Sequence, residues 1–89
     1  MAGRHRTTPE KRARAQRLGR ALARAREQAE RTQESVAQEV GVVVSTVRNV
    51  EAGRSADPGV FLITGICAVL GVDIAAVCRD AAFEAPEQD

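Results

Sequence analysis

The side chains best suited to chemistry lie on one face of a short predicted helix, residues 44–52. Its apolar residues Val47 and Val50 are three apart, so they share a face that points inward. The remaining, outward face carries polar side chains: Ser45, Thr46, Arg48 and Asn49. Asparagine can bond bidentately to adenine and arginine to guanine, so this face holds the donors and acceptors that read base edges.

Residues suited to catalysis or metal binding are not clustered. Cys67 and Cys78 lack a CxxC spacing, and the single histidine, His5, is distant from both. A zinc site would lack ligands. We expect two buried thiols packed as small hydrophobic side chains, with one disulfide as the alternative. Paired carboxylates and a phosphate-binding glycine loop are also lacking, so we expect no enzyme, cofactor, metal or small-molecule substrate.

The helix at 44–52 is the second of two, and Gly41 separates it from a predicted helix over 33–40. Thr32 can cap this preceding helix through its hydroxyl. Gly41 fits the left-handed position at which a helix stops, and Gly53 ends the second helix. Two short helices joined by a tight, glycine-containing turn are typical of a helix-turn-helix.

The rest of the chain predicts three further helices. Thr8 caps the first, from Pro9 to about Ala29, within which Gly19 marks a close approach of another helix or is simply tolerated. The fourth helix, Val60–Leu70, is apolar on nearly all sides, and the fifth runs from Ile74 to about Phe83. We therefore expect an all-α fold: a compact five-helix bundle with a central helix-turn-helix. The domain spans 8–83, between a flexible basic arm (1–7) and a disordered acidic tail (84–89).

Charge is distributed unevenly, although the net charge is only +1. Residues 1–31 hold ten of the thirteen basic residues, whereas 32–89 hold nine of the twelve acidic ones. The basic segment could bind phosphates, reach into a minor groove, or be a solvated helical face. The N-terminus lacks the apolar segment of a secretory signal, and no apolar run reaches the roughly 20 residues that span a bilayer. We expect a soluble, cytoplasmic protein.

From Leu18 to Val77 the sequence resembles the lambda-repressor-like (Cro/repressor-type, XRE-type) DNA-binding domains. The resemblance rests on the joint order and spacing of short pieces: Leu18-Gly19, Leu22, Arg26, Thr32-Gln33-Glu34, Val36-Ala37, Gly41-Val42, Thr46-Val47, Val50-Glu51-Ala52-Gly53, Pro58 and Leu70-Gly71-Val72.

The resemblance implies roles for two groups of residues. In the motif itself, Ala37 is small where the two helices cross, Gly41 forms the turn, and Val47 packs beneath; Arg26 and Glu51 correspond to a partly buried salt bridge. Against DNA, it implies four base-facing residues: Val44, Ser45, Arg48 and Asn49. It further implies three contacts to the DNA backbone: Gln33, Thr46 and Arg54.

Two positions depart from the family pattern. Arg31 stands where an apolar residue is usual. The run Val42-Val43-Val44 stands where Ser or Thr usually caps the second motif helix. Either Ser45 caps a helix that starts later, or Val43 and Val44 present an apolar surface to thymine methyls or to a protein.

Two functions follow from the resemblance. The first is a sequence-specific transcriptional regulator, a repressor by preference, that binds double-stranded DNA as a homodimer on a partly palindromic operator. The alternative is a protein-interaction module on the same fold that does not read DNA sequence.

Overall fold

The computed structural model describes residues 8–55 and 57–82, which form five α-helices and, within those ranges, no strand. In chain order these are α1 (Pro9–Gln28), α2 (Gln33–Val40), α3 (Val44–Glu51), α4 (Val60–Leu70) and α5 (Ile74–Ala82). The predicted all-α bundle is confirmed, and the helices differ from the predicted ones by a residue at most. The predictions for the basic arm, for Phe83 and for the acidic tail lie outside the described residues.

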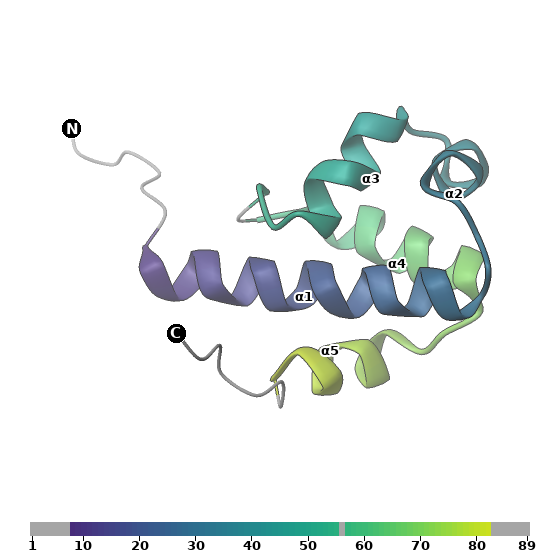
Figure 1. Cartoon of the computed structure of the whole chain (residues 1–89). Coiled ribbons are helices and arrows are strands. Elements are labelled where there is room, and N and C mark those ends of the chain that lie inside the picture. Colours follow the sequence, from purple (N-terminus) through teal and green to yellow (C-terminus); the bar gives the residue numbers. More distant parts are fainter. Residues whose placement is uncertain (1–7, 56, 83–89) are drawn as a thin grey trace.

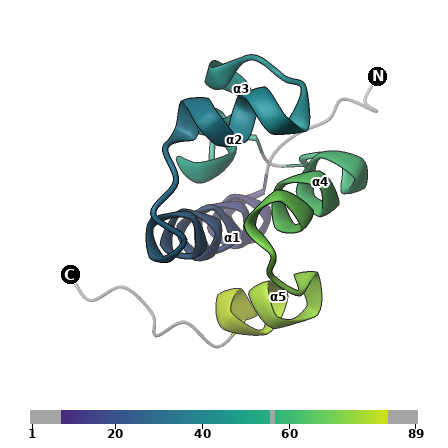
Figure 2. The same cartoon turned by 90° about the vertical axis from the view of Figure 1, so that its right-hand side faces the viewer.

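The long helix α1 separates the helix-turn-helix from the C-terminal helix (Figure 1). It packs against α3 on one side and α5 on the other, while α2 packs on both α3 and α4. Figure 2 looks almost along α1, with α2 and α3 above it, α4 beside it and α5 below. The motif is therefore held at one edge of the molecule, opposite α5.

The core is filled by small aliphatic side chains from all five helices. Its largest fully buried side chains are Leu22, Val36 and Val47, one from each of α1, α2 and α3. Ala37 of α2 is also buried. Burial of each large aliphatic side chain stabilises the fold by about 1.5–3 kcal/mol, and here it ties the motif to α1.

Local signals at the helix ends act as the sequence predicts. The Thr8 hydroxyl accepts a hydrogen bond from the Lys11 N–H (3.1 Å), and that of Thr32 accepts one from Ser35 N–H (3.0 Å). Gly41 ends α2 with φ of +92°, a backbone conformation that glycine adopts without steric cost. Each end of α2 is thus defined by a single residue, Thr32 through its hydroxyl and Gly41 through its backbone conformation.

Gly19 marks a close approach of two helices, which decides between the two interpretations left open above. A Cβ at this position would lie 2.5 Å from the carbonyl oxygen of Glu51 and closer still to that of Val50. Both oxygens belong to the backbone of α3, which cannot shift as a side chain could. The lack of a side chain at Gly19 therefore sets how closely α1 and α3 pack.

One expectation about burial needs correction. Cys67 is buried and its burial raises the pKa of the thiol, but Cys78 is exposed on α5, so the predicted pair of buried thiols is wrong for Cys78. The helix α4 is apolar on nearly all sides but is buried over only part of its surface. Its first turn projects Val60 and Phe61 into solvent, Phe61 with 88% of its surface exposed.

Among the described residues, no single helix is long and apolar enough to cross a membrane. Only α4 and α5 taken together would pass by length and composition, and they are bent by 106° relative to each other.

Gly19→Ala should destabilise the fold although alanine is the better helix former. The added methyl group must displace the α3 backbone, and overpacking of this kind costs about 2 kcal/mol. Gly65→Ala is the matched control, because a Cβ there meets only Val40 Cγ1 at an ordinary 3.5 Å. This control should gain roughly 0.5–1 kcal/mol from helix propensity. Urea unfolding followed by circular dichroism measures both, and equal effects would contradict the close packing of α1 on α3.

Candidate nucleic-acid interface

The exposed face of α3 carries three of the four predicted base-facing side chains. Ser45, Arg48 and Asn49 are exposed, whereas Val44 is half-buried against the core. Arg48 pairs loosely with Glu34 of α2 (3.5 Å), and both side chains are mostly in solvent. Exposed pairs of this kind contribute little to stability, so the Arg48 guanidinium is free to exchange Glu34 for another partner.

Asn49 and Arg54 lie together at the end of α3. Arg54 Nη1 donates to the Asn49 side-chain oxygen (3.0 Å), and the Arg54 N–H donates to the Asn49 carbonyl (2.9 Å). The carboxamide of Asn49 keeps its two N–H donors, and Arg54 extends beyond Gly53. A predicted base contact and a predicted phosphate contact thus sit next to each other on one edge of the motif.

Beneath the exposed face, Arg26 of α1 holds the end of α3 through Glu51. Arg26 Nε donates to Glu51 Oε2 (2.7 Å) and Nη2 donates to Oε1 (3.1 Å), a bidentate pair. The two side chains are only 14% and 10% exposed. The resemblance implied this salt bridge, and the fold places the two residues in contact.

The pair belongs to a larger polar network at the junction of α1, α2 and α3. Arg26 Nη1 donates to the Arg31 carbonyl (2.8 Å), and the Gln33 amide donates to Glu51 Oε1 (2.9 Å). The hydrogen bond to Glu51 raises the pKa of Arg26, against the opposing effect of burial. The stabilising charge on Arg26 is therefore lost only as the pH rises through this raised pKa, far above neutrality.

Two members of this network were not foreseen. Gln33 was predicted only as a contact to the DNA backbone, but one of its amide N–H groups is used to hold Glu51. The Arg31 carbonyl was not predicted at all, although an arginine has five N–H donors and a bidentate glutamate satisfies only two of them. The N–H donors of Arg26 that Glu51 leaves unused are the sequence feature that could have predicted a further acceptor. The turn that presents the Arg31 carbonyl contains Glu30 with φ of +58°.

Arg31 stands where the family pattern has an apolar residue, but its polar partners hold it at the surface. Its Nε donates to Ser35 Oγ (2.9 Å), and its guanidinium forms an ion pair with Glu39. Both partners lie on α2, at four and eight residues from Arg31. The arginine thus runs along the surface of α2 and leaves the core undisturbed.

The start of α3 rules out the first alternative proposed for the valine run, and of the second alternative only Val43 presents an exposed apolar side chain, because Val44 packs against the core. The helix begins at Val44, and Val43 occupies the capping position without a side-chain hydrogen bond. Thr46 is half-buried, and its N–H donates to the Val43 carbonyl (3.0 Å). Val43 is 67% exposed. Ser45 is therefore a residue of the helix and not its cap.

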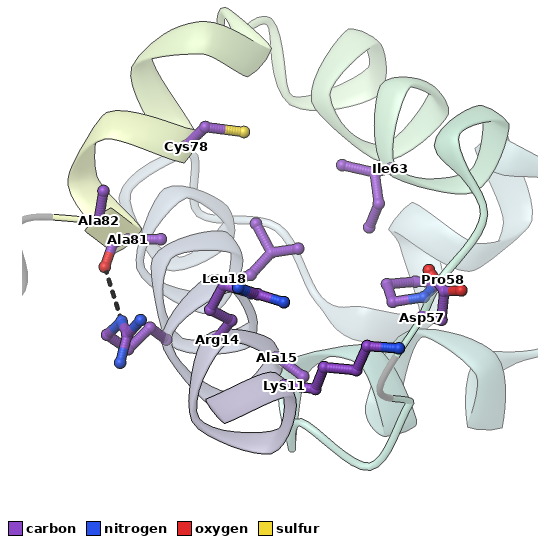
Figure 3. A pocket seen from close by; sticks show the side chains of 11 residues that line it. Lys11, Arg14, Ala15, Leu18, Asp57, Pro58, Ile63, Cys78, Ala81 and Ala82 are labelled. Atoms are coloured by element: carbon purple, nitrogen blue, oxygen red, sulfur yellow. Dashed lines mark hydrogen bonds between the residues drawn. The ribbon is translucent and has the colours of Figure 1, made fainter. Parts of the chain in front are cut away.

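A groove of about 510 Å³ lies elsewhere, between the first half of α1, the loop before α4, and α5 (Figure 3). Apolar residues such as Leu18 and Ile63 line it, with Lys11 and Arg14 from α1 also on its wall. None of its lining residues belongs to α2 or α3. In the described part of the chain, no three His, Cys, Asp or Glu side chains come close enough to hold a metal ion.

The arrangement of α2, the Gly41 turn and α3, packed on α1, defines a helix-turn-helix domain. The profile of the family described as "Helix-turn-helix domain" matches residues 17–79. The chain belongs to this family, and the helix-turn-helix recognised in the sequence is confirmed.

One similar solved structure is that of the clp gene regulator ClgR from C. glutamicum. It is 27% identical and superposes with a TM-score of 0.76, covering 84% of this chain and 96% of that one. The similarity is consistent with the lambda-repressor-like resemblance. No curated protein matches the chain significantly.

Glu51→Ala should destabilise the fold by about 3 kcal/mol, because it leaves the Arg26 charge buried without its partner. The double substitution Arg26→Met with Glu51→Leu should cost clearly less than the single one, since it removes both charges together. Arg48→Ala is the control for an exposed pair and should cost under about 0.5 kcal/mol. Denaturant unfolding of the three variants tests this. A Glu51→Ala loss as small as that of the control would show that the pair is an ordinary surface salt bridge.

Proposed function

We propose that this chain is a transcriptional regulator that binds double-stranded DNA sequence-specifically through α3. The observation that carries the proposal is the exposed polar face of α3, held at the edge of a helix-turn-helix by a partly buried hydrogen-bond network. In this class of motif the N-terminal part of the second helix enters the major groove. We assign base contacts to four residues: Val44, Ser45, Arg48 and Asn49.

The backbone contacts follow from the position of α2. Gln33 is the first residue of α2, where unpaired N–H groups favour a phosphate, and its amide has a second N–H beyond the one used on Glu51. Thr46 lies on α3 between Ser45 and Arg48, and Arg54 lies just beyond the end of the helix. Phosphate contacts at these three places would fix the register of α3 in the groove.

The regulator acts as a homodimer, and as a repressor, on a partly palindromic operator. A single α3 offers few base contacts, and two copies related by a two-fold axis would double them on symmetric half-sites. The first turn of α4 supports this part of the proposal, because Val60 and Phe61 are large apolar side chains in solvent. Such a pair can be covered by the same pair of a second copy in an isologous interface.

The second candidate is a protein-interaction module on the same fold. The exposed Val43 beside α3 favours it, since an apolar side chain there could equally meet a protein surface. The two candidates differ in what Arg48 and Asn49 do. Only a DNA reader depends on them for sequence preference.

Selection of duplexes from a random pool tests the proposal. A regulator should enrich one partly palindromic sequence with half-sites about one helical turn apart. Arg48→Ala and Asn49→Ala should each weaken binding to that duplex by about 1–3 kcal/mol and relax the preference at one base pair. Arg79→Ala on α5 is the matched control, an exposed arginine away from α3, and should leave the preference unchanged.

Salt dependence gives the second criterion for the same experiment. Affinity should fall steeply as salt rises, because each neutralised phosphate releases a counterion. The proposal is wrong if no duplex is enriched at low ionic strength. It is also wrong if Arg48→Ala and Asn49→Ala bind the same sequences as the unmodified chain.

A further inference from the structure

Val43, the N-cap residue of α3, is a poorer helix cap than Thr8 of α1 or Thr32 of α2. Thr8 and Thr32 cap α1 and α2 through their hydroxyls, whereas Val43 makes no side-chain hydrogen bond. Valine is among the least favourable residues at this position, and serine or threonine would satisfy one of the orphan N–H groups of the first turn. The position is thus locally unfavourable, in contrast to the caps of α1 and α2.

Packing within the chain does not account for the valine. Its neighbours Val42 and Val44 pack against the core, whereas Val43 is absent from the core and 67% exposed. Val43 belongs to the turn between α2 and α3. Figure 1 shows this turn at the edge of the molecule opposite α5. An apolar side chain is thus exposed at the place where the motif meets DNA.

Of the four bases, only thymine offers an apolar group in the major groove, its 5-methyl. Residues at the N-terminus of the recognition helix are the ones that reach base edges. A valine ahead of this helix presents two methyl groups and no donor or acceptor. Its chemistry therefore matches a thymine methyl and no other feature of the groove floor.

We propose that Val43 is a specificity-determining residue that packs on the 5-methyl group of one thymine in each half-site. The inference rests on the DNA-reading function proposed above and adds a base identity to it. The missing cap then has a physical reason. A serine at position 43 would stabilise α3 but would present a hydroxyl in place of the two methyl groups, so helix stability is sacrificed for base discrimination.

The test replaces thymine by deoxyuridine, one position at a time, in the duplex enriched from the random pool. This removes the methyl group and leaves base pairing intact. At one thymine in each half-site, the change should weaken binding of the full chain by about fourfold, the value of one buried methyl group. At other thymines outside the contacts of α3 the affinity should not change.

Variants at position 43 test whether the Val43 side chain is responsible for the preference for that thymine. In Val43→Ser and Val43→Ala the affinity ratio between thymine and deoxyuridine duplexes should fall to about one at that position. Val43→Thr, which keeps one methyl group, should give an intermediate ratio. Val43→Ser should also unfold at a higher temperature than Val43→Ala, because only serine restores the cap. This shows that the loss of discrimination is not a loss of folding.

The outcomes separate this inference from the function on which it rests. If a duplex is enriched but Val43→Ser keeps the full thymine preference, the inference is overturned while DNA reading stands. The exposed valine then serves another contact, such as one with a protein. If no duplex is enriched, both the inference and the proposed function are wrong.

Discussion

The bidentate salt bridge between Arg26 and Glu51 is the interaction on which the geometry of the motif depends. It joins α1 to the end of α3, and the same two side chains bind the Arg31 carbonyl and the Gln33 amide, so that all three N-terminal helices meet at one partly buried network. Gly19 allows this contact by letting the α3 backbone approach α1. Such a pair fixes the relative orientation of the two helices more than it stabilises the fold, because the cost of desolvating the charges offsets much of their attraction. Its consequence is that the exposed face of α3 is presented in one fixed orientation.

The fold was largely predictable because its signals are local. Thr8, Thr32 and Gly41 define helix ends through their own hydrogen bonds or backbone angles, and the valines of α2 and α3 repeat with helical spacing. Such signals depend on a few neighbouring residues and can be read without knowing the tertiary structure. They placed all five helices to within a residue.

The features that could not be predicted from the sequence depend on contacts between segments that are far apart in the chain. The Arg31 carbonyl is a backbone atom without any side-chain signature, and the second role of Gln33 appears only when Glu51 is brought beside it. Helical spacing predicted that Cys78 points inward, but this residue lines the open groove between α1 and α5, so its side chain stays exposed. The close approach at Gly19, and a further one where a Cβ on Gly53 would meet Gln16 of α1, likewise depend on how α1 and α3 pack. Among the base-facing candidates, Val44 is half-buried, whereas Ser45, Arg48 and Asn49 are exposed.

The central claim is that α3, fixed on α1, is the surface that meets DNA. A titration of the full, isotope-labelled chain with its preferred duplex, followed by backbone amide NMR shifts, tests it most directly. We predict that the largest shifts occur in residues 43–49 and at Gln33 and Arg54, while the amides of Arg26 and Glu51 keep their environment because the buried network does not rearrange. Shifts confined to the groove between α1 and α5, with α3 unperturbed, would contradict the account.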